Sequence, residues 1–138
     1  MITYDNDLTP MDYIKLREAV GWNALTENQA ARGIEHTTFL VSAKSDGETV
    51  AMARVLFDYG YTVFISDVIV SPGFQGLGIG KHMLEELLKF IEDNSIPGEF
   101  LNISLQAASG KEEFYKKFGF LARPCDGMGA GMTLKVNG

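Results

Sequence analysis

The chain has 138 residues, enough for one domain, and 46% of them are apolar, which excludes an intrinsically disordered chain. Its net charge of −6 argues against nucleic acid as the main ligand, because binding to a phosphate backbone depends on Lys and Arg, and an acidic surface instead attracts cations such as amines. No apolar run is long enough to span a membrane, and the N-terminus lacks the basic and apolar parts of a signal peptide, so we expect a cytoplasmic protein.

The first part of the chain predicts a short strand, two helices and a meander of strands. After a strand at Ile2–Tyr4, Thr9 is a suitable N-cap and Pro10 suits the first helical position. Apolar residues at helical spacing continue this helix to about Gly21, and a second helix follows over Glu27–Ile34. Three strands are then predicted, at Thr37–Lys44, Glu48–Phe57 and Thr62–Val70.

The second part predicts a helix over Gly78–Glu92, a strand over Glu99–Leu105 and a helix over Lys111–Phe118. Two closing strands follow, at Phe120–Arg123 and Met132–Val136. The strands on either side of the Gly78–Glu92 helix should be parallel, because a strand–helix–strand unit forms a right-handed crossover. We therefore expect a single α+β (mixed α/β) domain over residues 1–138, with a mixed and mostly antiparallel sheet.

A glycine-rich turn joins the third meander strand to the following helix. Gly73, Gly76, Gly78 and Gly80 allow the backbone to approach a ligand closely. The start of the helix offers unpaired N–H groups and a positive dipole end to an anion, and Lys81 adds a charge. The junction therefore predicts a phosphate site.

Two common phosphate-binding signatures do not fit this turn. A Walker A loop requires glycine where Gln75 stands and Ser or Thr where His82 stands. A dinucleotide fingerprint requires glycine at Lys81 and a parallel βαβ context. The pattern that remains is Q-x-x-G-x-G, over residues Gln75 to Gly80.

This pattern, after an apolar strand that ends Val-x-Pro, resembles the acetyl-CoA site of the GCN5-related N-acetyltransferase (GNAT) family. The segment from Glu113 to Phe120 is similar to the family's F-Y-x-x-x-G-F element. Further pieces resemble a small bacterial and plastid branch that includes plant serotonin N-acetyltransferases: Leu16–Trp22, Ala53-Arg54, Asp67–Pro72 and Gly131-Met132. The resemblance covers nearly the whole chain and implies the GNAT fold, with a parallel split at the central strands and helices on both faces.

The resemblance also implies acetyl-CoA as co-substrate, no metal, and a set of site residues. The backbone of Val68, Ile69 and Val70 would bind the pantetheine arm and the thioester oxygen, which is stabilisation by fixed N–H dipoles. The backbone of the glycine turn would hold the pyrophosphate, through Gln75, Gly76, Leu77, Gly78, Ile79, Gly80 and Lys81. Many family members carry a cofactor-binding Asn at the position of Ala108, so no contact is assigned to this residue.

Tyr115 matches the family's usual general acid. A phenol with a pKa of about 10 can protonate a thiolate whose conjugate acid has a pKa of about 8.5, while staying un-ionised at neutral pH. Without the motif, the favoured interpretation would be a core aromatic packed beside Phe114 and Phe118.

The general base is not readable from the sequence. A hairpin turning at Tyr59-Gly60 would place Arg54 opposite Ile65 and diagonal to Asp67. We therefore expect a structural ion pair between Arg54 and Asp67, and a base that acts through water is the alternative.

The acceptor site is only weakly indicated. Trp22 either stacks on an aromatic or cationic acceptor or packs under its loop, and His36 is a weaker candidate for the acceptor cleft. His82 is expected near solvent, and no pattern around the single cysteine, Cys125, activates a thiol. The hairpin aromatics Tyr59 and Tyr61 are either turn residues or part of a homodimer surface.

The resemblance implies an acetyl-CoA-dependent N-acetyltransferase that acts on a primary amine, and we expect a small molecule as the acceptor. The lack of an activated nucleophile favours direct attack of the amine in a ternary complex. We expect neither nucleic acid nor a membrane as partner. Two alternatives remain open: a protein or peptide N-acetyltransferase, and a non-catalytic acetyl-CoA-binding regulator.

Overall fold

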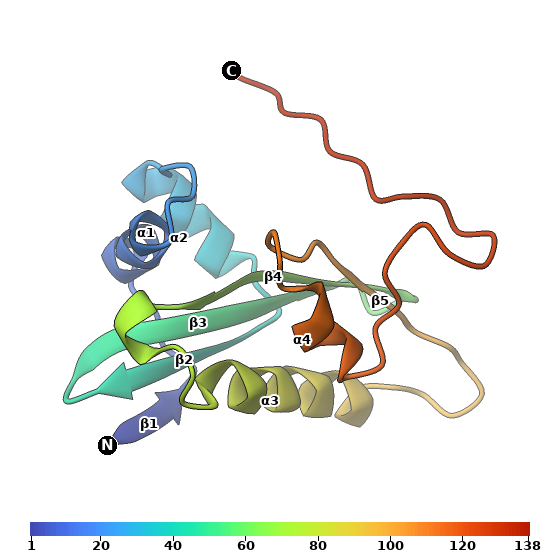
Figure 1. Cartoon of the computed structure of the whole chain (residues 1–138), viewed down its shortest axis with the longest axis horizontal. Coiled ribbons are helices and arrows are strands. Elements are labelled where there is room, and N and C mark those ends of the chain that lie inside the picture. The colour runs from blue at the N-terminus through green and yellow to red at the C-terminus, as the bar shows by residue number, and fades with distance from the viewer. The chain divides into compact units, whose positions relative to one another are not determined.

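A computed structural model describes residues 1–138, and the chain divides into two compact units, Met1–Ser104 and Leu105–Gly138. The first unit contains β1 (Ile2–Asp5), α1 (Pro10–Ala19), α2 (Glu27–Glu35), β2 (Phe39–Ser45), β3 (Glu48–Phe57), β4 (Thr62–Val70), the short 3-10 helix η1 (Pro72–Phe74) and α3 (Ile79–Asp93). The strand β5 (Asn102–Leu105) ends at the boundary, and α4 (Glu112–Lys116) belongs to the second unit. Figure 1 labels these elements along the chain.

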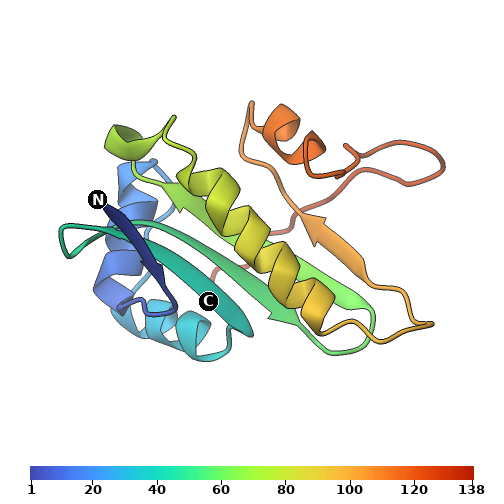
Figure 2. The ribbon, with the colours of Figure 1, turned by 90° about the horizontal axis from the view of Figure 1, so that it is seen from below.

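The sheet has five strands in the order β1-β2-β3-β4-β5. The first three pairs are antiparallel, as the predicted meander requires. At the other edge β5 lies beside β4, and Figure 2 shows these two strands running in the same direction, with α3 in the connection between them on one face of the sheet. The predicted mixed, mostly antiparallel sheet is confirmed.

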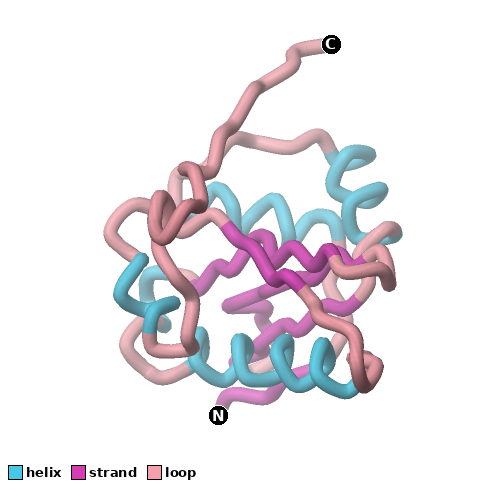
Figure 3. Tube along the Cα trace, turned by 90° about the vertical axis from the view of Figure 1, so that its right-hand side faces the viewer, coloured by secondary structure: helices cyan, strands magenta, loops and turns pink.

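Helices cover both faces of this sheet (Figures 1 and 3), as the resemblance implied. On one face Tyr13 and Leu16 of α1 and Ala30 of α2 pack against Met52 and Ile69 of the sheet. On the other face α3 buries one apolar stripe: Ile79, Met83, Leu84, Leu87 and Ile91. Burial of such stripes is the main term that holds the layers together, at about 25 cal/mol for each Å² of apolar surface removed from water. No helix of the chain is long and apolar enough to cross a membrane.

The start of α1 agrees with the sequence pattern. The Thr9 hydroxyl accepts a hydrogen bond from the Asp12 backbone N–H at 3.1 Å, and Pro10 occupies the first turn, where its missing N–H is not needed. The helix α2 is capped in the same way, because the Thr26 hydroxyl accepts a hydrogen bond from the Gln29 N–H at 3.1 Å. These caps fix the entry of the chain into the helical layer.

The predicted register of the β3–β4 hairpin is wrong by one residue at Arg54 and by two residues at Met52. Arg54 lies opposite Ser66, not Ile65, and Met52 lies opposite Ile69, not Asp67. The turn is longer than a two-residue hairpin turn because the Asp58 carboxylate accepts from the Gly60 N–H at 2.8 Å, which closes a local loop. A bulge further along β4 then shifts the register again.

The second unit contradicts the two predicted closing strands. Residues 120–138 contain no strand, only an isolated bridge between Cys125 and Met128, and α4 is shorter than the predicted helix. An alternating pattern such as that of Met132–Val136 forms a strand only with a ladder partner, and Met132, Leu134 and Val136 are 85–89% exposed here. Glycines at 127, 129 and 131 also weaken any strand between these segments.

Candidate functional site

The strand β4 is bulged where the candidate thioester-binding backbone begins. The β3–β4 register passes from Arg54 opposite Ser66 to Met52 opposite Ile69, so β4 has one more residue than β3 between these pairs. Asp67 adopts a left-handed backbone with a φ of 53°. A bulge takes its extra residue out of the ladder and turns side chains toward new faces. The backbone that leads into Val68 is therefore released from regular pairing with β3.

The bulge also explains where the Asp67 side chain points. In a regular strand, neighbouring residues face opposite sides, so Asp67 would point away from the face shared by Arg54 and Ser66. Instead, the Asp67 carboxylate meets Arg54 at 2.9 Å between Nε and Oδ2. The predicted ion pair is confirmed, although by a different register.

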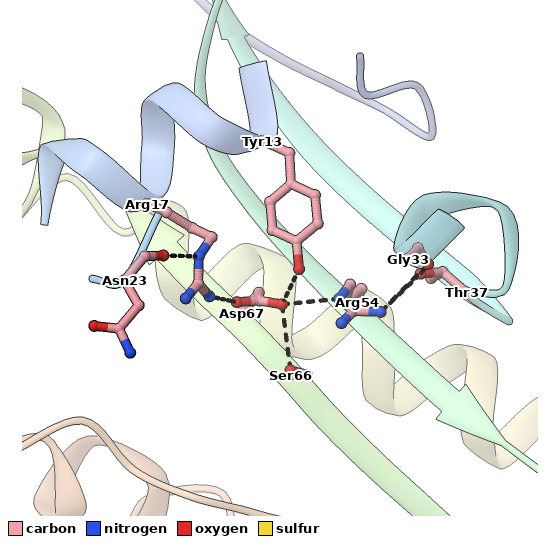
Figure 4. A network of polar contacts seen from close by, with 8 residues as sticks. All are labelled: Tyr13, Arg17, Asn23, Gly33, Thr37, Arg54, Ser66 and Asp67. Carbon is pink, nitrogen blue, oxygen red and sulfur yellow. Dashed lines mark hydrogen bonds and ion pairs between the residues drawn. The ribbon is translucent and has the colours of Figure 1, made fainter. Parts of the chain in front are cut away.

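Two side chains of α1 complete the surroundings of this carboxylate (Figure 4). The Arg17 guanidinium contacts Oδ1 at 2.8 Å between heavy atoms, and the Tyr13 hydroxyl donates to Oδ2. The Ser66 hydroxyl lies 3.3 Å from Oδ2. The Asp67 side chain is only 6% exposed, so this buried charge is compensated by two guanidinium groups, as a buried charge requires.

These contacts determine the protonation of the network. Burial alone raises the pKa of the Asp67 carboxyl, but the hydrogen bonds from Tyr13 and Arg54 and the charges of Arg54 and Arg17 outweigh it, so the pKa is lowered. Burial and the adjacent carboxylate raise the pKa of Tyr13 to about 12. At neutral pH the network therefore holds an ionised Asp67 and a protonated Tyr13.

The lowered pKa of Asp67 predicts a pH dependence of stability. A carboxyl whose pKa is lowered by folding stabilises the protein above its unfolded pKa of about 4, and this contribution is lost as pH falls through the folded pKa. We expect urea unfolding between pH 7 and pH 3 to show a steeper loss of stability in the wild type than in Asp67→Asn. Parallel curves for the two proteins would contradict this.

The glycine turn has the backbone geometry of a ligand cradle. Gly76 and Gly78 have φ values of 80° and 81°, which residues with a side chain rarely adopt. A Cβ added at Gly73, Gly76 or Gly78 would meet no other atom of the chain within 4 Å. Packing against the protein therefore does not demand glycine here, whereas the left-handed backbone and the open space above it fit close approach of a ligand.

The first turn of α3 has an exposed, uncapped end at the glycine turn, while its first residue is buried in the core. Gly78 is the N-cap, and no side chain caps the helix. Ile79 is 2% exposed and packs into the core, which fixes the direction of the first turn. The Gln75 side chain donates back to the Val70 carbonyl at 3.0 Å and ties the turn to the end of β4. The uncapped N–H groups and the nearby Lys81 suit a pyrophosphate.

Tyr115 belongs to the second unit, where it lies on α4. Its ring packs edge-on against Phe114 at 5.0 Å and Phe120 at 6.0 Å between centroids. Burial raises the pKa of Tyr115 to about 12. The hydroxyl is therefore protonated at neutral pH, which is the state that a general acid needs.

The acceptor-site candidates are engaged within the chain. Trp22 packs against the core cluster beneath α1 and α2, and the Arg17 guanidinium lies 5.6 Å above its ring. The His36 ring nitrogen Nδ1 is 2.9 Å from the Arg32 carbonyl at the end of α2. His82 is half-exposed, stacks on Tyr4 and pairs with Glu86 at 2.7 Å.

Tyr13 and Arg17 are the residues of this region that the sequence patterns missed. They are four residues apart on α1, so they occupy one face of the helix, but Tyr13 was interpreted only as part of the apolar stripe. The signal that could have found them is an arginine one helical turn after a tyrosine of the apolar stripe, together with an aspartate inside an apolar strand that needs cationic partners.

The chain contains no group of three or more His, Cys, Asp and Glu side chains that could hold a metal ion. The groups at the start of α3 are uncapped backbone N–H groups, with Lys81 in the first turn, and such groups suit an anion.

Known proteins resemble this chain over most of its length. The model of the acetyltransferase (GNAT) family matches residues 7–120. A histone acetyltransferase of soybean (Glycine max) is 32% identical over 129 residues, and the match covers 86% of this chain and 54% of the relative. A chloroplastic serotonin N-acetyltransferase of rice (Oryza sativa subsp. japonica) is 30% identical over 109 residues, 76% of this chain and 52% of the relative. The chain spans about half the length of these curated relatives.

Among solved structures, a probable acetyltransferase of unknown function from methicillin-resistant Staphylococcus aureus superposes with a TM-score of 0.88. The two proteins are 29% identical, and the match covers 99% of this chain and 100% of that one.

Proposed function

The chain belongs to the acetyltransferase (GNAT) family, and we propose that it transfers the acetyl group of acetyl-CoA to a primary amine of a small molecule. The observation that carries this proposal is the turn at Gly76 and Gly78. Its left-handed backbone, open to a ligand, leads directly into an uncapped helix start.

We assign the two ends of the donor to two stretches of the first unit. The backbone N–H groups from Gln75 to Lys81 would hold the pyrophosphate, with the α3 dipole favouring its negative charge. The backbone from Val68 to Val70, which follows the bulge, would hold the pantetheine arm and polarise the thioester carbonyl. The bound donor supplies an activated acetyl group.

The transfer needs no covalent enzyme intermediate. The neutral amine attacks the carbonyl carbon, the C–S bond breaks, and the nitrogen that becomes the amide releases one proton to the solvent, from which the general acid is re-protonated. The departing thiolate takes one proton. We assign that proton to Tyr115, because it occupies the tyrosine position of the F-Y-x-x-x-G-F element and its pKa of about 12 keeps it protonated. Cys125, the single free cysteine, has no role in this scheme.

A small-molecule acceptor is supported by the rice relative, whose name gives serotonin as its substrate, and by the net charge of −6, which favours cationic amines. A protein acceptor is the second candidate, because the soybean relative is named a histone acetyltransferase.

Release of free CoA from acetyl-CoA tests the proposal and separates the two acceptors. The panel contains arylalkylamines, polyamines, amino sugars, amino acids and short lysine-containing peptides. We expect release with one class of small amine, dependent on protein concentration. Release with peptides alone would transfer the assignment to a protein acceptor. Binding of acetyl-CoA without release across the panel would contradict the enzymatic proposal and favour a regulator.

A further inference from the structure

Asp67 has a backbone conformation that glycine adopts more readily than residues with a side chain. Its φ of 53° lies in the left-handed region, where residues with a side chain are uncommon, although Asp and Asn tolerate it best. The residue is also the extra one in the β4 bulge. Something in the surrounding structure must therefore hold the backbone in this conformation.

The side-chain contacts of Asp67 provide that restraint. We call them the Asp67 cage: the donors of Tyr13, Arg17, Arg54 and Ser66 around one carboxylate (Figure 4). Both carboxylate oxygens are engaged, Oδ1 by Arg17 at 2.8 Å and Oδ2 by Arg54 at 2.9 Å. The donors come from α1, from β3 and from β4 itself, so the carboxylate is held from several directions.

The two arginines of the cage are themselves fixed. The Arg17 Nε donates to the Asn23 carbonyl at 2.9 Å, and its guanidinium lies over Trp22. The Arg54 Nη1 donates to the Thr37 hydroxyl at 3.1 Å, and its guanidinium lies 5.7 Å above the Tyr13 ring. The cage is therefore connected to the loop after α1 and to the segment after α2. These connections restrict the movement of both arginines and, through them, of the Asp67 carboxylate.

We propose that Asp67 is a positioning residue for acetyl transfer: the Asp67 cage fixes the β4 bulge, and thereby sets the backbone of Val68 to Val70 against the thioester. This inference rests on the proposed function. In it the carboxylate holds the backbone in place and does not transfer a proton. A general base needs a lone pair that can face the substrate or a water molecule, whereas both Asp67 oxygens accept hydrogen bonds within the chain and the side chain is 6% exposed.

The key variant is Asp67→Asn. Asparagine has almost the same size and also tolerates the left-handed backbone, so the substitution removes the charge that the two arginines hold and leaves the intrinsic preference of the position. Asp46→Asn is the matched control, because exposed Asp46 has a φ of 50° in the β2–β3 turn, outside the cage. Tyr13→Phe removes one donor and keeps the ring, so it remains informative even where Asp67→Asn folds poorly.

The first readout is amide hydrogen exchange of the protein without ligand. We expect peptides that cover Ser66 to Val70 to exchange about ten-fold faster or more in Asp67→Asn, with a smaller increase in Tyr13→Phe and none in Asp46→Asn. This readout does not depend on turnover. Unchanged exchange in both cage variants would overturn the claim that the cage fixes the bulge.

The second readout, the kinetics of CoA release, distinguishes a residue that positions the thioester-binding backbone from one that only stabilises the fold. In Asp67→Asn we expect kcat for CoA release to fall about ten-fold or more, while the Kd for acetyl-CoA changes less than about three-fold, because the glycine turn still holds the nucleotide end. The acidic limb of the pH–rate profile should keep its midpoint. Loss of that limb would make Asp67 the base and overturn the proposal, as would a normal kcat per folded molecule.

The failure of the proposed function would look different. If the wild-type protein releases no CoA with any amine, the acetyl-transfer assignment fails, while the exchange experiment still decides whether the cage fixes the bulge.

Discussion

Gly78→Glu weakens acetyl-CoA binding by about 100-fold or more in the proposed site, as measured by calorimetry on the folded variant. Two effects add at this position. The residue is the N-cap of α3 with a φ of 81°, so a side chain strains the turn that presents the N–H groups. The new carboxylate then stands where the pyrophosphate would bind and repels it. Loss of charge-assisted hydrogen bonds of this kind is enough to raise the Kd by about 100-fold.

Gly47→Glu is the matched control for this variant. Gly47 has a φ of 80° in the β2–β3 turn, and an added Cβ would also meet no atom within 4 Å. Both variants therefore carry the same backbone strain and the same new charge, but only one changes the glycine turn at α3. Equal affinity of both variants for acetyl-CoA would contradict the assignment of the pyrophosphate to this turn.

Tyr115→Phe lowers kcat by about ten-fold to 100-fold at neutral pH, with the affinity for acetyl-CoA and the melting temperature nearly unchanged. The effect arises because phenylalanine cannot protonate the departing thiolate. The pKa of about 12 keeps the wild-type hydroxyl protonated but also makes it a weaker acid than an ordinary tyrosine, so we expect an effect no larger than the lower end of the usual range for acid catalysis, which is about 100-fold. Phenylalanine keeps the ring contacts with Phe114 and Phe120.

Tyr59→Phe provides the comparison for this substitution. It removes the same hydroxyl from a tyrosine that is 61% exposed at the β3–β4 turn, outside the F-Y-x-x-x-G-F element. We expect wild-type turnover. A normal kcat in Tyr115→Phe would show that Tyr115 is only a packing residue, which was the alternative to its catalytic role.

Much of the first unit was predictable because local patterns and tertiary packing agree there. Thr9 and Pro10 begin a helix through contacts within four residues, and the apolar stripe of the third helix marks the face that it buries. The position of the glycine turn was also predictable, because Gly76 and Gly78 occupy the two positions with a left-handed backbone, which glycine adopts most easily. The contact between Arg54 and Asp67 was predicted from a hairpin register that is wrong, and it forms because the bulge in β4 turns the Asp67 side chain toward Arg54.

What was not predictable depends on contacts between distant residues. The bulge at Asp67 has no local signal, because it is held by Tyr13 and Arg17, which lie 54 and 50 residues earlier. The hairpin register was shifted by a side-chain hydrogen bond within the turn, from the Gly60 N–H to Asp58. The closing strands were predicted from alternation alone, and alternation does not specify a ladder partner.

The most direct test of the account is a titration of the ¹⁵N-labelled protein with acetyl-CoA, observed by the shifts of its backbone amide signals. We expect the largest shifts in two stretches, Val68 to Val70 and Gln75 to Lys81, and we expect 3′-phospho-ADP, which lacks the pantetheine arm, to shift only the second. Shifts that leave the glycine turn unchanged, or no shifts at all at millimolar acetyl-CoA, would contradict the assignment of this turn to the pyrophosphate of coenzyme A.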